Sequence, residues 1–276
     1  MNTHDLIQTR GQYLESSRGK VPQKYEVYNF LDEIVGYLFP ILSKNYNQED
    51  EKNLDDIMLL LNRILSSYDS CLANVDSVII KFEEALPDLY ESMTKDAVAI
   101  CEGDPAAKSI EEVIICYPGF YGILVYRIAH ELDKLSIPII PRILTEYSHS
   151  KTGIDIHAKA KIGKSFCIDH GTGIVIGETS EIGDSVKIYQ GVTLGAVSVS
   201  KKHAGKKRHP TIGNNTVIYA GSTILGGNTI IGHHSTIGGT VWLTHSVDPY
   251  SVVLNQVKVH LKNNNPDQKD VIDFVI

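Results

Sequence analysis

Apolar residues in the second half of the chain recur every six positions. The series reads Ile156, Ile162, Ile168, Ile176, Ile182, Ile188, Leu194, Ile212, Ile218, Ile224, Ile231, Ile237 and Leu243. A helix would favour a period near 3.6 and an ordinary strand a period of two, so neither explains a period of six. Six-residue units are typical of a solenoid, in which each unit supplies one short strand and a tight corner. The pattern predicts a parallel β-helix over residues 151–262.

The six-residue rhythm is interrupted at three places. Two extra residues fall within Asp169-His170-Gly171-Thr172-Gly173, and a one-residue slip lies at Gly226-Gly227. Between Leu194 and Ile212 the repeat is replaced by a basic stretch, G-A-V-S-V-S-K-K-H-A-G-K-K-R-H-P-T. Loops that leave a rigid scaffold are where binding and catalysis are usually found. We therefore expect the chemistry of this protein at the interruptions.

The first half of the chain carries helical spacing. Apolar residues three and four positions apart predict helices over 28–39, 54–68, 78–86, 87–101 and 121–132, and a short one ending at 148. Asp104, followed by Pro105, is expected to N-cap a further helix. The predicted fold class is α+β, with a helical domain over 1–150, the β-helix over 151–262 and a flexible polar tail over 263–276.

Composition and charge narrow the class of protein. The 276 residues include 42% hydrophobic and 21% charged residues, as in an ordinary globular protein. The net charge of -7 disfavours nucleic acid and anionic membranes as partners. No apolar run approaches the ~20 residues of a membrane span, and no secretion signal is recognisable at the N-terminus. Four scattered cysteines predict buried, reduced thiols in a cytoplasmic protein.

Three motifs identify a family. They are D-I-H-A-K-A-K-I-G from Asp155, I-D-H-G-T-G-I-V-I-G-E ending at Glu178, and K-R-H-P-T-I-G from Lys207. Together they resemble the serine O-acetyltransferases, which are left-handed β-helix enzymes. The resemblance spans roughly residues 155–243, and Gly103-Asp104-Pro105-Ala106 is similar to the aspartate site of the family's helical domain. It implies transfer of the acetyl group of acetyl-CoA to the hydroxyl of L-serine, the first step of cysteine synthesis.

The resemblance implies a histidine base. A serine hydroxyl is a poor nucleophile at neutral pH, so direct attack on a thioester needs a positioned base, and histidine has a suitable pKa. By resemblance His170 is that base. Asp155, about one coil earlier, would fix its tautomer and stabilise the imidazolium. The alternatives are a polar corner residue for His170 and a capping residue for Asp155.

The resemblance also implies contacts to the charged groups of serine. Arg208 and His209 would meet its carboxylate, and Arg208 offers a two-pronged donor. Asp104 and Asp169 would meet its ammonium group, and Glu178 would support the histidine loop. An equally open alternative for Arg208 is a solvated position in a basic run.

Acetyl-CoA is expected along the edge of the solenoid, where small residues allow close approach. The residues implied are Gly195, Ala196, Ala220, Gly221 and Gly239, and the backbone N–H of Ala196 could stabilise the oxyanion. The chain departs from the family at two points. It has Gly195-Ala196-Val197 where Gly-Gly-Thr is more common, and residues 254–259 replace a G-V-P-A-R segment.

The resemblance extends to assembly, regulation and partners. It implies homotrimers with active sites between neighbouring β-helices, paired into hexamers by the helical halves. It also implies feedback inhibition by L-cysteine and insertion of the C-terminal Ile276 into O-acetylserine sulfhydrylase.

Three other functions stay open. They are an acyltransferase for a sugar or another amino acid, an inert assembly scaffold, and a metal hydrolyase. A metal hydrolyase would hold zinc through histidines, and the chain offers His203, His209, His233, His234 and His245. No consistent ligand set is recognisable, and adjacent histidines on a strand are expected to diverge, so no metal is expected.

Overall fold

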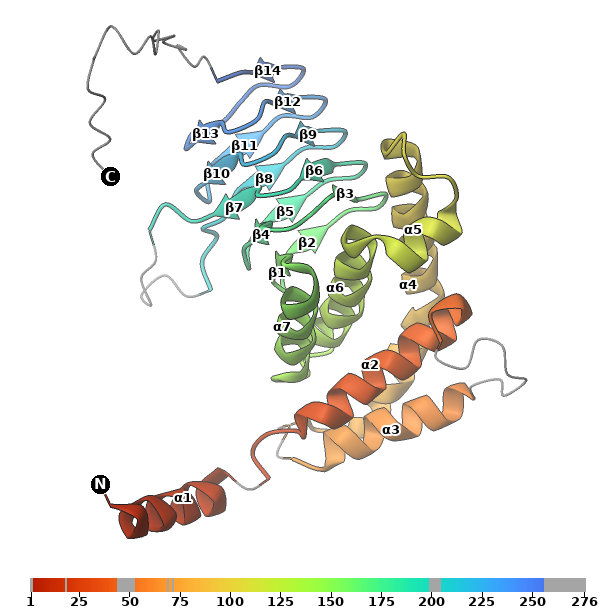
Figure 1. Ribbon diagram of the computed structural model, residues 1–276, viewed down its shortest axis with the longest axis vertical. Helices are drawn as coiled ribbons and strands as arrows, with labels where there is room; N and C mark the ends of the chain where they lie inside the picture. Colours follow the sequence, from red (N-terminus) through yellow and green to blue (C-terminus); the bar gives the residue numbers. More distant parts are fainter. Residues whose placement is uncertain are drawn as a thin grey trace, which may run out of the picture.

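The protein consists of a helical part followed by a stack of short strands (Figure 1). The structure is a computed structural model, and it describes residues 2–17, 19–43, 53–68, 70, 72–198 and 205–255. The helices are α1 (Thr3–Ser17), α2 (Lys24–Leu38), the 3-10 turn η1 (Pro40–Leu42), α3 (Leu54–Ser66), α4 (Val75–Gly103), α5 (Ile110–Cys116), α6 (Pro118–Lys134) and α7 (Ile140–Thr152). Helix α1 lies apart from the others in Figure 1.

Two expectations about the helical part are wrong. A break at Pro87 was expected, but α4 runs through it without interruption, because Phe82, Leu86, Leu89 and Met93 on both sides of the proline are all buried in the core. Packing of this apolar face outweighs the hydrogen bond that proline cannot donate.

Asp104 does not N-cap the next helix. It C-caps α4, and its Oδ1 accepts a hydrogen bond from the N–H of Ala106 at 2.8 Å. Helix α5 begins only at Ile110, where the Ser109 hydroxyl accepts from the N–H of Glu112 at 3.2 Å and serves as the N-cap. Asp104 thereby keeps one carboxylate oxygen for partners outside its own loop.

The second part is a parallel β-helix, which confirms the predicted fold class. Three sheets form its walls. Sheet A holds β1 (Asp155–Ile156), β4 (Val175–Ile176), β7 (Thr193–Gly195), β10 (Thr223–Leu225) and β13 (Trp242–Leu243). Sheet B holds β2 (Lys161–Ile162), β5 (Glu181–Ile182), β8 (Thr211–Ile212) and β11 (Ile230–Ile231). Sheet C holds β3 (Cys167–Asp169), β6 (Lys187–Tyr189), β9 (Val217–Ile218), β12 (Thr236–Ile237) and β14 (Val252–Val253).

The predicted apolar ladder fills the inside of the coils. In sheet A, Ile156 pairs with Ile176, Ile176 with Leu194, and Leu194 with Ile224. All members of the series are buried except Ile162, which is partly buried in the first coil. The six-residue period arises from this packing, because each inward residue stacks on the equivalent residue of the next coil.

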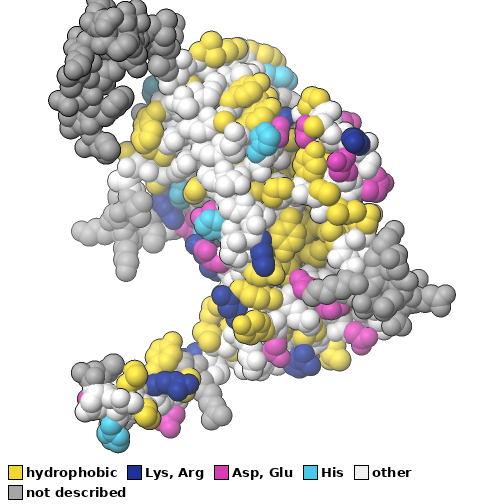
Figure 2. Space-filling view, viewed as in Figure 1, with side chains coloured by type: hydrophobic (Ala, Val, Ile, Leu, Met, Phe, Trp, Pro, Cys, Tyr) yellow, Lys and Arg dark blue, Asp and Glu magenta, His cyan; other side chains and the backbone are white. Residues whose placement is uncertain are grey.

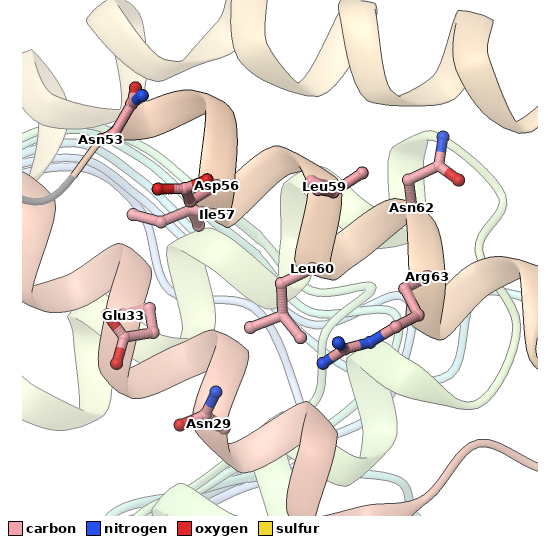
Figure 3. A pocket seen from close by; sticks show the side chains of 9 residues that line it. All are labelled: Asn29, Glu33, Asn53, Asp56, Ile57, Leu59, Leu60, Asn62 and Arg63. Atoms are coloured by element: carbon pink, nitrogen blue, oxygen red, sulfur yellow. The ribbon is translucent and has the colours of Figure 1, made fainter.

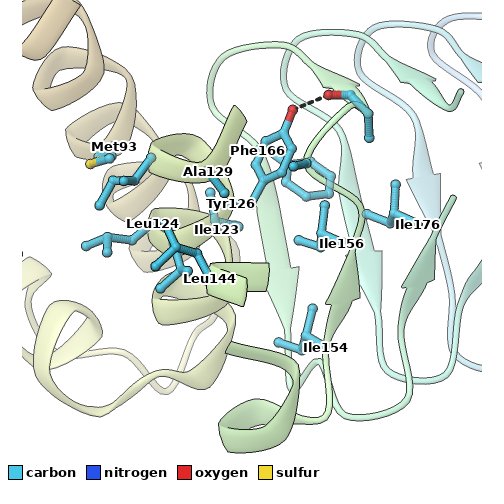
Figure 4. Packing of buried hydrophobic residues seen from close by; sticks show 14 of the residues in the cluster. Met93, Ile123, Leu124, Tyr126, Ala129, Leu144, Ile154, Ile156, Phe166 and Ile176 are labelled. Atoms are coloured by element: carbon cyan, nitrogen blue, oxygen red, sulfur yellow. Dashed lines mark hydrogen bonds between the residues drawn. The ribbon is translucent and has the colours of Figure 1, made fainter. Parts of the chain in front are cut away.

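Side chains of α6 close the open edge of the first coil. A terminal coil has carbonyl groups that no further strand can bond. The Tyr126 hydroxyl donates to the Ala160 carbonyl at 2.5 Å, as drawn in Figure 4, and the His130 ring contacts the Ala158 carbonyl through Nδ1 at 2.7 Å. Arg127 donates to the carbonyls of Ile162 at 3.0 Å and Gly163 at 2.6 Å. The helical part is therefore the structural cap of the β-helix.

A buried ion pair continues this cap. Arg127 binds both oxygens of Asp96 on α4, at 2.8 and 3.0 Å, and Asp96 also accepts the N–H of Phe166 at 2.8 Å. Asp96 is wholly buried. Burial raises the pKa of Asp96, while the guanidinium and the Phe166 N–H act in the opposite direction. Figure 4 shows part of the buried apolar cluster between the helices and the first coils, including Met93 of α4 and Phe166.

Two further features bear on the class of protein. Within the described residues no single helix is long and apolar enough to cross a membrane, although α5 and α6 together pass that test across a 77° bend. Three of the four cysteines lie in the described residues, and all three are free. The expectation that the thiols are buried holds for Cys167 but is wrong for Cys116, which is exposed.

Candidate active site

His170 lies at the corner where the chain passes from sheet C to sheet A, here called the C–A corner. It follows β3 directly and has a left-handed backbone with φ of 58°. Gly171 and Gly173 are also left-handed, with φ of 97° and 84°, a conformation that glycine adopts without strain. The two extra residues thus turn the chain outward, and the His170 side chain is 71% exposed. An exposed imidazole in a strained corner is available to a substrate.

Two carboxylates accompany His170. Asp169 Oδ1 lies 3.7 Å from His170 Nε2, and its Oδ2 lies 2.9 Å from the Lys187 ammonium. Asp104 reaches the same region from the end of α4, and its Oδ2 accepts a hydrogen bond from the Tyr117 hydroxyl at 2.7 Å. Lys187 and His170 both lie close enough to influence the Asp104 carboxyl electrostatically.

Hydrogen bonds keep Asp104 ionised. The N–H of Ala106 and the hydroxyl of Tyr117 lower the pKa of Asp104, because both donate to the charged form. The same bond raises the pKa of Tyr117 to about 12, so its hydroxyl stays protonated and remains a donor. Asp104 and Asp169 together give the C–A corner the negative charge that an ammonium group requires.

Asp155 begins β1, on the coil before His170. Its register partner in β4 is Val175, five residues beyond His170, and its N–H bonds to the carbonyl of Ile174 at 2.9 Å. In the described part of the chain no ion pair joins the Asp155 and His170 side chains. The loop of His170 does pack against the start of this coil, since the N–H of Gly173 donates to the Gly153 carbonyl at 2.8 Å.

Glu178, Arg208 and His209 form a second group at the corner between sheets A and B, here called the A–B corner. The Arg208 guanidinium forms a short ion pair with Glu178. That hydrogen bond lowers the pKa of Glu178, which stays charged. Nη1 of Arg208 is buried and bonds to no group among the described residues. The Glu178 ion pair therefore leaves part of the hydrogen-bonding capacity of the guanidinium unused.

His209 is buried beside this ion pair as a neutral ring. Its Nδ1 accepts the N–H of Thr179 at 3.0 Å, and because a backbone N–H can only donate, the ring proton sits on Nε2. Burial and the charge of Arg208 lower the pKa of His209 to about 4. Gly177 makes room for the ring, since a Cβ there would lie 2.1 Å from Nε2. His209 therefore presents a fixed N–H donor.

The predicted acetyl-CoA residues divide between the same two corners. Ala220, Gly221 and Gly239 lie at the C–A corner in successive coils, and a Cβ on Gly239 would lie 3.3 Å from the Ala220 carbonyl. Gly195 ends β7 and Ala196 follows it, so both lie at the A–B corner. The N–H of Ala196 makes no hydrogen bond with another described residue.

Sheet A separates the two groups within one chain. The strand β4 and the residues beside it run from the C–A corner to Glu178, a distance of about 15 Å at ~3.3 Å per residue. The structure brings His170, Asp169 and Asp104 together, and separately Glu178, Arg208 and His209. Within one chain, the group at the C–A corner and the group at the A–B corner stay apart.

The sequence did not reveal three residues that hold the two groups in place, namely Tyr117, Lys187 and Thr179. Tyr117 stands between the expected helices and in none of the three motifs, Lys187 occupies an ordinary outward position of a coil, and Thr179 follows the second motif. Thr179 Oγ1 accepts the backbone N–H groups of Arg208 at 2.9 Å and His209 at 3.1 Å. Only the threonine carried a signal, because it directly follows G-E in the second motif.

Three other features of the described residues give no support for a separate site. A groove of about 580 Å³ between α2 and α3 (Figure 3) combines leucine, amide and charged side chains and lies far from both corners. On the face shown in Figure 2, basic and acidic side chains are interspersed, so this face offers no extended basic patch for nucleic acid. Burial raises the pKa of Cys167 to about 12, so this thiol is a poor nucleophile.

The histidines provide no metal centre in the described part of the chain. No group of three or more His, Cys, Asp or Glu side chains could hold an ion there. The expectation that His233 and His234 diverge is wrong, since their Nδ1 atoms lie 2.9 Å apart. The two histidines do not lie on a strand but at the corner between β11 and β12, where His234 has a left-handed backbone with φ of 58°. His203 lies outside the described residues.

Comparison with known proteins shows the family of this chain. No protein-family model matches the chain. A plasmid-encoded serine acetyltransferase of Synechococcus elongatus is 51% identical over 187 residues, which are 66% of this chain and 58% of that protein. A serine acetyltransferase of Bacillus pumilus is 39% identical over 182 residues, 66% of this chain and 82% of that protein. The chain belongs to the serine acetyltransferase family. It spans little more than half the length of the cyanobacterial relative.

Solved serine acetyltransferases share the whole fold. Isoform 3 from Entamoeba histolytica, in complex with cysteine, superposes with a TM-score of 0.75 at 35% identity, over 86% of this chain and 84% of that one. A serine acetyltransferase in complex with CoA superposes with a TM-score of 0.59 at 28% identity, over 83% and 92% of the two chains. In this serine acetyltransferase family member, too, the helical cap precedes the β-helix.

Proposed function

We propose that this protein transfers the acetyl group of acetyl-CoA to the hydroxyl of L-serine, giving O-acetyl-L-serine and CoA. The observation that carries the proposal is the exposed His170 beside two carboxylates, Asp169 and Asp104, in a member of the serine acetyltransferase family. A base next to an ammonium-binding group is what proton removal from an amino-acid hydroxyl requires.

Each charged group of serine finds a complementary group. Asp169 and Asp104 receive the ammonium. The Arg208 guanidinium and the Nε2–H of His209 receive the carboxylate, while Glu178 holds the guanidinium in place. Binding both ends of the substrate leaves the hydroxyl to be directed at His170.

The reaction follows from this placement. His170 takes the hydroxyl proton as the serine oxygen forms a bond to the thioester carbon, and Asp155 stabilises the imidazolium. The free N–H of Ala196 donates to the carbonyl oxygen as negative charge develops there. The C–S bond then breaks, the acetyl group stays on serine, and the proton held by His170 passes to the leaving thiolate.

The complete site needs two chains. Since the two groups lie at opposite ends of the strands of sheet A in one chain, we infer that neighbouring β-helices of a homotrimer place one C–A corner against the next A–B corner. The same contact joins Ala220, Gly221 and Gly239 of one chain to Gly195 and Ala196 of another. A cleft between two β-helices would hold acetyl-CoA along its length.

L-cysteine is proposed to compete with serine. It carries the same carboxylate and ammonium group, and a solved relative holds cysteine. The proposed binding of Ile276 to O-acetylserine sulfhydrylase concerns residues outside the described part of the chain.

The decisive experiment measures CoA release from acetyl-CoA with and without L-serine. CoA release is expected only with serine, to be lowered by L-cysteine, and to fall by at least about 100-fold in His170→Ala. His245→Ala removes another exposed histidine of the β-helix and should retain wild-type turnover. Equal turnover of His170→Ala and wild type would remove His170 as the base. Faster reaction with homoserine or a galactoside would reassign the acceptor.

A further inference from the structure

Lys187 is the most enclosed ammonium group near the C–A corner. It extends from β6, its side chain is 17% exposed, and its Nζ makes three contacts. It lies 2.9 Å from Asp169 Oδ2, donates to the Gly103 carbonyl at 2.6 Å, and sits 4.6 Å from the centre of the Tyr189 ring. These partners belong to β3, to the end of α4 and to β6 itself.

The contacts keep Lys187 charged. Burial lowers the pKa of Lys187, but hydrogen bonds with Tyr189 and Asp169 outweigh burial, and the pKa is raised above its ordinary value. The Gly103 carbonyl lies at the last turn of α4, the negative end of a 29-residue helix. A permanent cation is thus held between a carboxylate and a helix C-terminus.

Lys187 connects the two carboxylates of the C–A corner. It holds Asp169 directly, and it holds the backbone of Gly103, the residue before Asp104. The helix end also packs closely on β3, since a Cβ on Gly103 would lie 3.2 Å from Cys167 Sγ. Without Lys187, Asp169 would lose its cation, and the end of α4 would lose its only side-chain anchor to β6 among the described residues.

We propose that Lys187 is a positioning residue for amino-group recognition: one ammonium fixes Asp169 and the Gly103–Asp104 junction, so that both carboxylates face the same substrate ammonium. The proposal rests on the proposed serine acetyltransferase function. Lys187 also offsets one of the two negative charges, which limits the repulsion between Asp169 and Asp104 before substrate binds. A competing role would have Lys187 occupy the place of the substrate ammonium, and this predicts the opposite effect on affinity.

The test compares L-serine binding by calorimetry in Lys187→Met, Lys187→Arg and the wild type. Lys187→Met is expected to weaken serine binding at least about tenfold and to raise KM for serine similarly, with KM for acetyl-CoA within about twofold. Lys187→Arg, which keeps the charge, should recover most of the affinity. Lys161→Met is the matched control, because Lys161 pairs with Glu181 at 3.3 Å across the same coil step in sheet B and should leave serine binding unchanged.

Results other than the expected ones would each overturn a specific claim. A lower melting temperature of Lys187→Met with unchanged serine affinity would reduce Lys187 to a structural anchor, and tighter serine binding would establish competition. If Lys187→Met does not fold, Lys187→Gln supplies the same comparison, since it keeps an N–H donor for Gly103 without the charge. A wild type that binds no serine would remove the proposed function and this role together, whereas equal binding by wild type and variant removes only this role.

Discussion

At the scale of single residues, the neutral state of His209 makes the folded protein less stable in acid. The folded protein holds its pKa at about 4, below the value near 6.5 of an unfolded chain. Between these values the unfolded state binds a proton that the folded state does not, so stability rises with pH across this window. The stability that His209 contributes is therefore fully present above pH ~6.5 and is lost as the pH falls towards 4.

The pH dependence of unfolding tests this assignment. At fixed protein concentration, the free energy of unfolding in urea should fall by about 1–3 kcal/mol between pH 7 and pH 4 through His209. His209→Gln, which cannot titrate, should show a correspondingly smaller fall, whereas His245→Gln on the exposed surface should match the wild type. Equal pH dependence in all three proteins would show that His209 does not titrate in the folded state below its normal range.

The residues of the site differ in how well the sequence predicts them. His170, Asp169, Glu178 and Arg208 stand in motifs that interrupt the repeat, and such interruptions are visible without a structure. Lys187 and Tyr117 contribute through contacts between elements that are distant in sequence. Nothing local distinguishes them from an outward strand residue and a helix start, so only the fold reveals them.

At the scale of elements, the junction of cap and β-helix depends on Arg127. Four of its hydrogen bonds reach Asp96, Ile162 and Gly163, and Asp96 has no exposed surface. Arg127→Met would leave a buried carboxylate without its cation and two coil carbonyls without donors. We expect a loss of about 3–5 kcal/mol in the free energy of unfolding.

Urea unfolding at one pH measures this loss. Lys95→Ala on the same helix α4 removes only the exposed ion pair with Glu91, and its effect should stay below about 1 kcal/mol. Comparable effects of the two variants would show that the Asp96–Arg127 pair does not secure the junction.

The elements themselves were predictable where local pattern and packing agree. The six-residue period fixes strands and corners because each inward residue stacks on its equivalent one coil away. The break expected at Pro87 fails because the buried side chains on both sides of it come from the tertiary core, which local propensity does not include.

At the scale of the whole molecule, the two halves of the proposed site lie at opposite ends of the strands of sheet A. Co-assembly of two inactive variants distinguishes a shared site from a site within one chain. His170→Ala keeps a complete A–B corner, and Arg208→Ala keeps a complete C–A corner, so each homotrimer alone should have little activity. In a mixed trimer, one contact joins the intact His170 of one chain to the intact Arg208 of its neighbour.

The amount of recovered activity can be stated in advance. Random assembly makes about three quarters of the trimers mixed, each with one intact site in three, so co-expressed variants should recover roughly a quarter of wild-type turnover. Mixing the two separately purified homotrimers without exchange of subunits should recover none, which controls for carry-over. A co-expressed sample no more active than its parents would place the whole site within one chain. In that case Arg208 and His170 of the same chain would have to lie closer together in the active enzyme than they do in this structure.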